Sequence, residues 1–125
     1  MEGYSAKVKE SSIQLTAKQR IAIKDTSSAI KMDEATKENN IIIAPDFYAI
    51  IEVHNEKSDT KDYEKIVIQD RKTGERYTTG SKPFISTFLD IWADMEGEDE
   101  DWEIEVYPKE SSNYKGKTFL TCRII

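Results

Sequence analysis

The side chains best suited to covalent chemistry are one histidine, His54, and one cysteine, Cys122. A nucleophilic dyad would need the fold to bring these two together and a third group to orient the imidazole. Cys122 lies instead in an apolar run with Phe119 and Leu120, which indicates a buried thiol, and His54 ends a predicted strand. One histidine and one cysteine are also too few ligands for a zinc site. The sequence therefore predicts no catalytic residue, no metal and no cofactor, and a protein that is not an enzyme.

Carboxylates are numerous enough that composition alone does not exclude a two-metal nuclease. No Asp-x-Asp or Glu-x-Lys pair stands convincingly at the end of a predicted strand, however. The acidic run at residues 99–101 lacks the glycine-bearing twelve-residue pattern of a calcium loop. We interpret it as a solvated acidic loop.

A phosphate could be held where a predicted helix begins, at Gly80 and Ser81. Backbone N–H groups at a helix N-terminus bind anions, and Thr79 and Lys82 stand next to them. Ordinary capping of the helix explains the same residues, and neither a P-loop nor a dinucleotide fingerprint is present. Capping is therefore the preferred interpretation.

Aromatic and basic side chains alternate between residues 107 and 119, in a predicted loop that joins two strands. Single-stranded nucleic acid is bound by this mixture, because rings stack on bases for about 1–3 kcal/mol each while cations follow the backbone. A predicted hairpin near residues 71–77 repeats the pattern, and a solvated hairpin with tyrosines at its edge is the alternative interpretation. The candidate nucleic-acid-binding residues are Arg71, Lys72, Arg76, Tyr77, Tyr107, Lys109, Tyr114, Lys115 and Lys117.

Charge is distributed unevenly along the chain. The net charge is −6, yet residues 90–105 hold nine acids and no Lys or Arg, which leaves +3 for all other residues. An acidic surface of this kind can imitate phosphate and steer the protein to a basic partner. The candidate protein-interaction residues are Glu98, Asp99, Glu100 and Asp101. We expect the helix that precedes them to separate a basic, aromatic surface from this acidic end.

The elements that must position these residues are mostly strands. A continuous β-branched and aromatic pattern covers residues 41–53, where Pro45 predicts either two strands or one strand with an edge bulge. Strands at residues 63–70 and 75–79 flank a hairpin turn with Gly74. Near the N-terminus, Thr16 and Gln19 have capping-box spacing, which predicts one helical turn at residues 17–20, and Ile21 and Ile23 then alternate as in a short strand.

One amphipathic helix is predicted over about residues 82–96, before the last two strands. Ser81 can cap it, Pro83 suits its first turn, and Gly97 can end it. Its apolar side chains recur at helical spacing from Ile85 to Trp92. The predicted fold class is therefore α+β, mostly β, either an OB-like barrel or an antiparallel meander.

At 125 residues the chain is expected to be a single domain. No apolar run is long enough for a membrane helix, and the start does not read as a secretory signal. A lone cysteine cannot form an intramolecular disulfide, which fits a reducing compartment. We expect a cytoplasmic protein of a bacterial host cell, without a membrane partner, and we consider a homodimer as one of its assemblies.

Three segments resemble small proteins encoded by phages and mobile elements of Gram-positive bacteria. They are KDTSSAIKMDEA (24–35), YTTGSKPF (77–84) and NYKGKTFLTCRII (113–125), so the resemblance spans nearly the whole chain. Some of these proteins belong to replication modules and are described as single-stranded DNA-binding, which is what the resemblance implies here. The usual bacterial single-strand binders end in a disordered acidic tail, whereas the acidic residues of this chain lie inside it, at Glu96–Asp101.

Two functions follow as hypotheses, with an enzyme as a third. The first is a non-catalytic module that binds single-stranded DNA through the aromatic and basic residues. The second is an acidic protein-interaction module, or an inhibitor of a host DNA-binding enzyme, in which the acidic loop contacts a host or replication protein.

Overall fold

The computed structural model describes residues 4–57, 61–111 and 117–125. The N-terminal half contains β1 (Tyr4–Ser11), α1 (Ala17–Lys24), the 3-10 helix η1 (Thr26–Ser28), β2 (Ile30–Lys31), α2 (Met32–Ala35), β3 (Ile41–Ile43) and β4 (Pro45–Asn55). The C-terminal half contains β5 (Asp62–Asp70), β6 (Arg76–Thr79), α3 (Lys82–Met95), β7 (Ile104–Glu110) and β8 (Thr118–Ile124). The protein is α+β and mostly β, as the sequence predicts.

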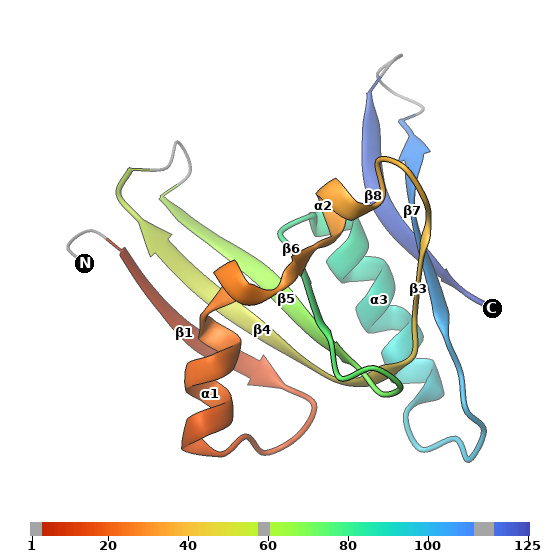
Figure 1. Cartoon of the computed structure of the whole chain (residues 1–125), viewed down its shortest axis with the longest axis horizontal. Coiled ribbons are helices and arrows are strands. Elements are labelled where there is room, and N and C mark those ends of the chain that lie inside the picture. The colour runs from red at the N-terminus through yellow and green to blue at the C-terminus, as the bar shows by residue number, and fades with distance from the viewer. Residues whose placement is uncertain (1–3, 58–60, 112–116) are drawn as a thin grey trace.

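The strands form two sheets, with α3 packed between them (Figure 1). One sheet has five strands in the order β1-β4-β5-β6-β2, and the other has three in the order β3-β7-β8. All neighbouring strands are antiparallel except β2 and β6, which are parallel. Across the described residues the two sheets do not close on each other. The sheets are therefore not closed into a barrel, and the β1–β4 and parallel β2–β6 neighbours show that the five-stranded sheet is not a simple antiparallel meander either.

The chain passes from one sheet to the other at Pro45. β3 ends at Ile43 in the three-stranded sheet, and β4 begins at Pro45 in the five-stranded sheet with a register shift before Phe47. Asp70 stabilises this β3–β4 crossing, since its Oδ2 accepts the backbone N–H of Ala44, the residue between the two strands, at 3.1 Å. The expected interruption at Pro45 is confirmed as two strands, and they belong to different sheets.

The main core lies between α3 and the two sheets. Ser81 caps the helix by accepting the N–H of Phe84 at 3.4 Å, and Gly97 follows its end with a φ of +87°. Phe84 and Phe88 are completely buried, and Trp92 packs edge-on against Tyr48 at 5.2 Å between ring centroids. The predicted amphipathic helix before the last two strands is confirmed, with bounds Lys82–Met95.

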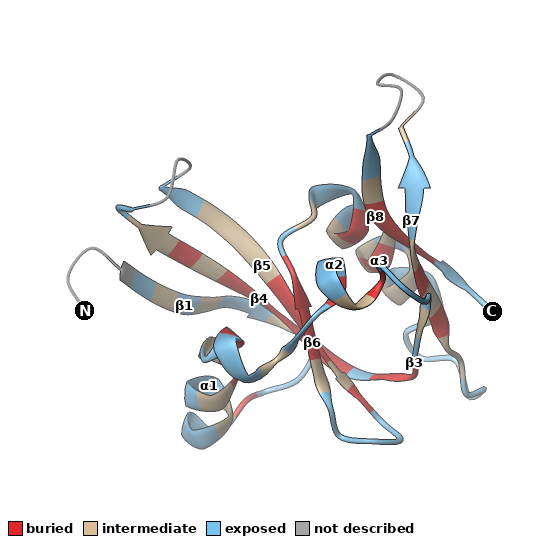
Figure 2. Ribbon diagram, turned by 45° about the horizontal axis from the view of Figure 1, so that its top comes forward, coloured by how far each residue is buried: buried red, intermediate tan, exposed pale blue. Residues whose placement is uncertain are grey.

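A second core lies on the opposite face of the five-stranded sheet, where α1 packs (Figure 2). The helix continues to Lys24, so the strand expected at Ile21–Ile23 is wrong. Ile21 is 67% exposed whereas Ile23 is 1% exposed. Residues two apart share a face in a strand but lie on nearly opposite sides of a helix, which explains this difference.

Candidate nucleic-acid interface

The basic hairpin between β5 and β6 lies against the acidic segment that follows α3. Lys72 Nζ donates to Glu103 Oε2 at 2.9 Å, and an Arg71 nitrogen lies 3.9 Å from Asp101 Oδ1. The expectation that α3 separates the basic surface from the acidic end is therefore wrong. Two of the predicted phosphate-binding side chains are already paired with carboxylates.

The next two predicted residues, Arg76 and Tyr77, point to opposite faces of β6. The Tyr77 ring belongs to the main core and is 9% exposed, with its hydroxyl donating to Glu75 Oε2 at 3.1 Å. Burial, reinforced by Glu75, raises the pKa of Tyr77 to about 12. Tyr77 is therefore a core residue, and its assignment to a base-stacking surface is corrected. Arg76 points away from the core, and its Nε donates to Gln69 Oε1 at 3.2 Å.

Tyr107 and Lys109 lie on the outward face of the three-stranded sheet, where the register brings two further residues beside them. Lys109 is paired with Phe119, and the Arg123 guanidinium carbon lies 5.1 Å from the centre of the Tyr107 ring. We call Tyr107, Lys109, Phe119 and Arg123 the Tyr107 face. Phe119 and Arg123 are absent from the residues predicted from sequence, because only the antiparallel register of β7 and β8 aligns them with Tyr107 and Lys109.

Glu105 is the acidic neighbour of the Tyr107 face. Its Oε1 accepts from Arg123 Nε at 2.8 Å, and its Oε2 accepts from Asn40 Nδ2 at 3.1 Å. The hydrogen bond from Asn40 and then that from Arg123 hold the pKa of Glu105 below its usual value. Arg123 is thus held against the Tyr107 ring by a carboxylate on the adjacent strand.

The remaining predicted residues belong to the tip of the β7–β8 hairpin. Tyr114 and Lys115 lie outside the described residues. Lys117 is exposed, and its carbonyl accepts the N–H of Ser111 at 2.9 Å. The described ends of this hairpin and the β5–β6 turn lie near opposite ends of α3 (Figure 1). The fold therefore does not gather all of the predicted basic residues on one surface.

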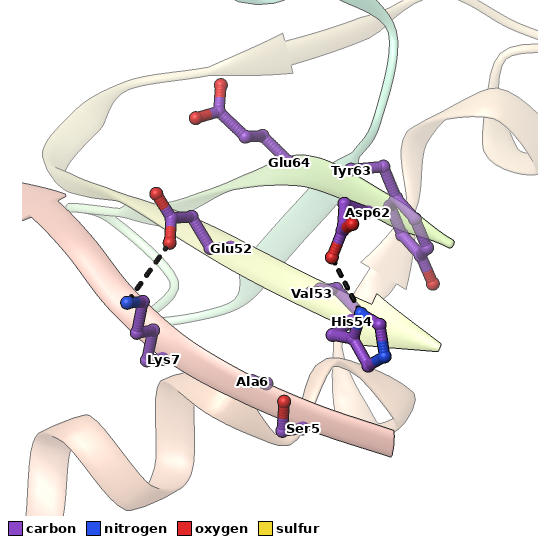
Figure 3. Close-up of a pocket in the computed structure, with 9 residues that line it drawn as sticks. All are labelled: Ser5, Ala6, Lys7, Glu52, Val53, His54, Asp62, Tyr63 and Glu64. Atoms are coloured by element: carbon purple, nitrogen blue, oxygen red, sulfur yellow. Dashed lines mark hydrogen bonds and ion pairs between the residues drawn. The ribbon is translucent and has the colours of Figure 1, made fainter. Parts of the chain in front are cut away.

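A concave region of about 660 Å³ lies over the free ends of β1, β4 and β5 (Figure 3). Ser5, His54 and Asp62 are direct cross-strand neighbours there. His54 Nδ1 is 2.7 Å from Asp62 Oδ1, while Nε2 is 3.1 Å from Glu56 Oε1. Asp62 first and Glu56 second raise the pKa of His54. Both imidazole nitrogens are already occupied by carboxylates, so neither is free to accept the proton of the Ser5 hydroxyl.

The other charged side chains of this region are also paired with each other. Lys7 Nζ lies 3.4 Å from Glu52 Oε2, and Glu64 accepts a hydrogen bond from Lys9. Among the residues that the structure describes, no three His, Cys, Asp or Glu side chains are grouped as metal ligands. The region is an ion-paired sheet surface.

Cys122 and His54 lie in different sheets. Cys122 is 4% exposed on β8, and burial raises the pKa of its thiol to about 12. The interpretation of Cys122 as a core thiol is confirmed.

Within the described part of the chain, every helix is too short or too polar to span a membrane. Comparison of the chain with protein-family models, with curated proteins and with solved structures finds no match.

Proposed function

We propose that this protein is a non-catalytic binder of single-stranded DNA and that the Tyr107 face contacts the bases. The observation that carries the proposal is the alignment of two aromatic rings, Tyr107 and Phe119, with the cation Lys109 on adjacent strands, while Arg123 beside them is paired with Glu105. Such a surface offers stacking to any base and positive charge to the backbone, which is how strands are bound without sequence preference. The resemblance to replication-module proteins of phages and mobile elements supports the same function.

We also propose that the fold is an open relative of the OB fold. β4, β5 and β6 form a meander, α3 follows, and the β7–β8 hairpin completes the order. Residues 41–55 contribute β3 to one sheet and β4 to the other. The first strand of a five-stranded Greek-key barrel would likewise pair on both sides of the barrel. OB folds commonly bind oligonucleotides, so the strand order supports the proposed function.

The test is the binding of a fluorescent oligo-dT, followed by anisotropy at two salt concentrations. Removal of one stacked ring costs about 1–3 kcal/mol, so we expect Tyr107→Ala and Phe119→Ala each to weaken binding by roughly 5- to 150-fold. Tyr107→Phe keeps the ring and should retain most of the affinity. Urea unfolding of each variant verifies that it is folded.

Charge reversal provides the matched control for this experiment. Lys109→Glu changes a cation on the Tyr107 face, and Lys82→Glu makes the same change on an exposed lysine of α3. The proposal predicts a larger loss of affinity for Lys109→Glu. Equal losses, or no binding of oligo-dT to the wild-type protein at low salt, would overturn it.

The acidic segment favours a second function, protein interaction. Glu98, Asp99 and Glu100 are exposed, and none forms an ion pair with another described residue. We propose that these carboxylates contact a basic host or replication protein. The test first captures a partner with the wild-type protein and verifies that the purified partner binds again. The triple variant Glu98→Gln/Asp99→Asn/Glu100→Gln should not bind this partner. Unchanged binding of that partner by the variant would exclude the segment as its contact.

A further inference from the structure

A row of cations lies on the five-stranded sheet, on the face that points away from α3. Lys65 on β5 stands beside Gly80, where an added Cβ would lie 3.9 Å from Lys65 Cγ. Lys31 on β2 is paired with Thr78 of β6, and Thr78 is paired with Val67 of β5. Lys31 and Lys65 therefore project from the same face of the sheet, on the two strands that flank β6.

Arg76 continues the row toward the β5–β6 turn. It is paired with Gln69, four residues along β5 from Lys65, which corresponds to about 13 Å at the rise of a strand. At the other end, the Lys65 ammonium lies 5.8 Å from the centre of the Tyr63 ring. We call Lys31, Lys65 and Arg76, together with Tyr63, the Lys65 face.

The acids of β5 and of the turn project to the opposite face or into the crossing. Asp62 contacts His54, and Glu64 contacts Lys9. Asp70 accepts N–H groups at the β3–β4 crossing and in the turn. The strand positions that share the Lys65 face are neutral, namely Val67, Gln69, Thr78 and Gly80.

Within the described residues, the cations of the Lys65 face are therefore not balanced by ion pairs. No ion pair joins Lys31, Lys65 or Arg76 to an acid among the described residues, and Arg76 bonds the neutral amide of Gln69. Burial and the nearby charge of Lys31 both lower the pKa of Lys65. Strand pairing holds these like charges near each other, and a bound polyanion would reduce the repulsion between them.

We propose that the Lys65 face binds a run of phosphate groups. Where the ligand is DNA, this part of the inference rests on the proposed function: the Lys65 face then holds a stretch of backbone other than the one whose bases lie on the Tyr107 face, because the two faces belong to different sheets. Phosphates follow one another at about 3.4 Å along one strand of a duplex, so the row is long enough to contact more than one. Free polyphosphate carries the same chemistry and is the other possible source of the ligand.

The experiment uses inorganic tripolyphosphate and oligo-dT as separate probes of the wild-type protein. Amide resonances of β2, β5 and β6 are followed by NMR during each titration. The double variant Lys31→Gln/Lys65→Gln is compared with Lys37→Gln/Lys82→Gln, which removes the same charge from exposed lysines elsewhere. Each phosphate contact on a single strand contributes about 0.7 to the slope of log K against log salt.

If the inference is correct, tripolyphosphate shifts resonances around Lys31 and Lys65, and the double variant loses these shifts. The variant should bind oligo-dT at least 10-fold more weakly at low salt, with a slope shallower by about 1.4. The control variant should retain both. Tripolyphosphate binding without any oligo-dT binding would support the site and overturn the proposed function. Oligo-dT binding that the double variant leaves unchanged, with no response to tripolyphosphate, would overturn the site and leave the proposed function intact.

Discussion

At the scale of single residues, Asp70 organises the place where the two sheets meet. It is 5% exposed, and its carboxylate accepts the N–H groups of Ala44 at 3.1 Å, Lys72 at 2.7 Å and Thr73 at 3.0 Å. Burial by itself raises the pKa of Asp70, but the N–H donors from Ala44, Thr73 and Lys72 outweigh it and leave the pKa below its usual value. One side chain thus joins the β3–β4 crossing to the β5–β6 turn.

We expect Asp70→Ala to lower the free energy of unfolding by about 2–3 kcal/mol, because hydrogen bonds to a charged acceptor are lost and buried donors stay unsatisfied. Urea unfolding measures this loss, and Asp46→Ala, an exposed aspartate on β4, is the control. A loss no larger than that of the control would contradict this role of Asp70.

The pH dependence of stability gives a separate prediction for Asp70. A carboxyl whose pKa is depressed by folding stabilises the folded state above its unfolded pKa of about 3.9, and this stabilisation is lost as the pH falls through the folded value. We therefore expect the wild type to lose stability below about pH 4 more steeply than Asp70→Asn. Urea midpoints measured from pH 7 down to pH 2.5 test this. Parallel curves for the two proteins would show that Asp70 does not contribute.

Cys122 gives a third prediction at this scale. The thiolate is the reactive form, and burial keeps the pKa of Cys122 near 12. We expect almost no reaction with a thiol reagent such as DTNB in the folded protein at pH 8, and rapid reaction in urea. Rapid labelling of the native protein would show that the β8 side of the core opens readily.

At the scale of elements, α1 and α3 differ in how well local sequence patterns predict them. α3 has a cap, an early proline, a terminal glycine and an apolar stripe, and all of these signals agree. α1 has a capping box but only one buried residue, Ile23, so its short pattern also fits a strand. Its helical state depends on packing against Leu15 and the five-stranded sheet. A local sequence pattern carries no information about these tertiary contacts.

The core face of α3 can be tested by cavity formation. Phe88→Ala removes a fully buried ring that packs against Tyr48 at 5.7 Å between centroids. We expect the free energy of unfolding to fall by about 3–5 kcal/mol. Ser86→Ala, on the exposed side of the same helix, should change it by less than about 0.5 kcal/mol. Similar values for both variants would contradict the packing of α3 between the sheets.

At the scale of the whole molecule, opposite charges meet at the end of α3. The pairs Lys72–Glu103 and Arg71–Asp101 bring the acidic segment next to the basic hairpin. The net charge of −6 also repels a polyanion before any contact forms. The proposed DNA binding should therefore depend strongly on salt and on the charge of this segment.

We expect the triple variant Glu98→Gln/Asp99→Asn/Glu100→Gln to bind oligo-dT more tightly than the wild type at low salt, since its net charge is −3. The difference should disappear at high salt, where exposed charges are screened. Anisotropy titrations at about 50 mM and 500 mM salt measure it. Weaker binding by the variant would instead place these carboxylates in the DNA interface.

Sequence patterns by themselves determined the elements with strong local signals. They identified α3 and its caps, the Gly74 turn, the interruption at Pro45 and the burial of Cys122. These features depend on the period of apolar residues and on the backbone preferences of glycine and proline, which are properties of the chain nearby.

Only the tertiary structure decided which face of each strand points outward and which strands are neighbours. Alternation along β6 shows that Arg76 and Tyr77 point to opposite sides, but not that Tyr77 belongs to the core. The pairing of β7 with β8 brings Arg123 over Tyr107, and the pairing of β2 with β6 brings Lys31 near Lys65. Strand register joins residues far apart in the chain, so the two proposed binding surfaces form only when the sheets assemble.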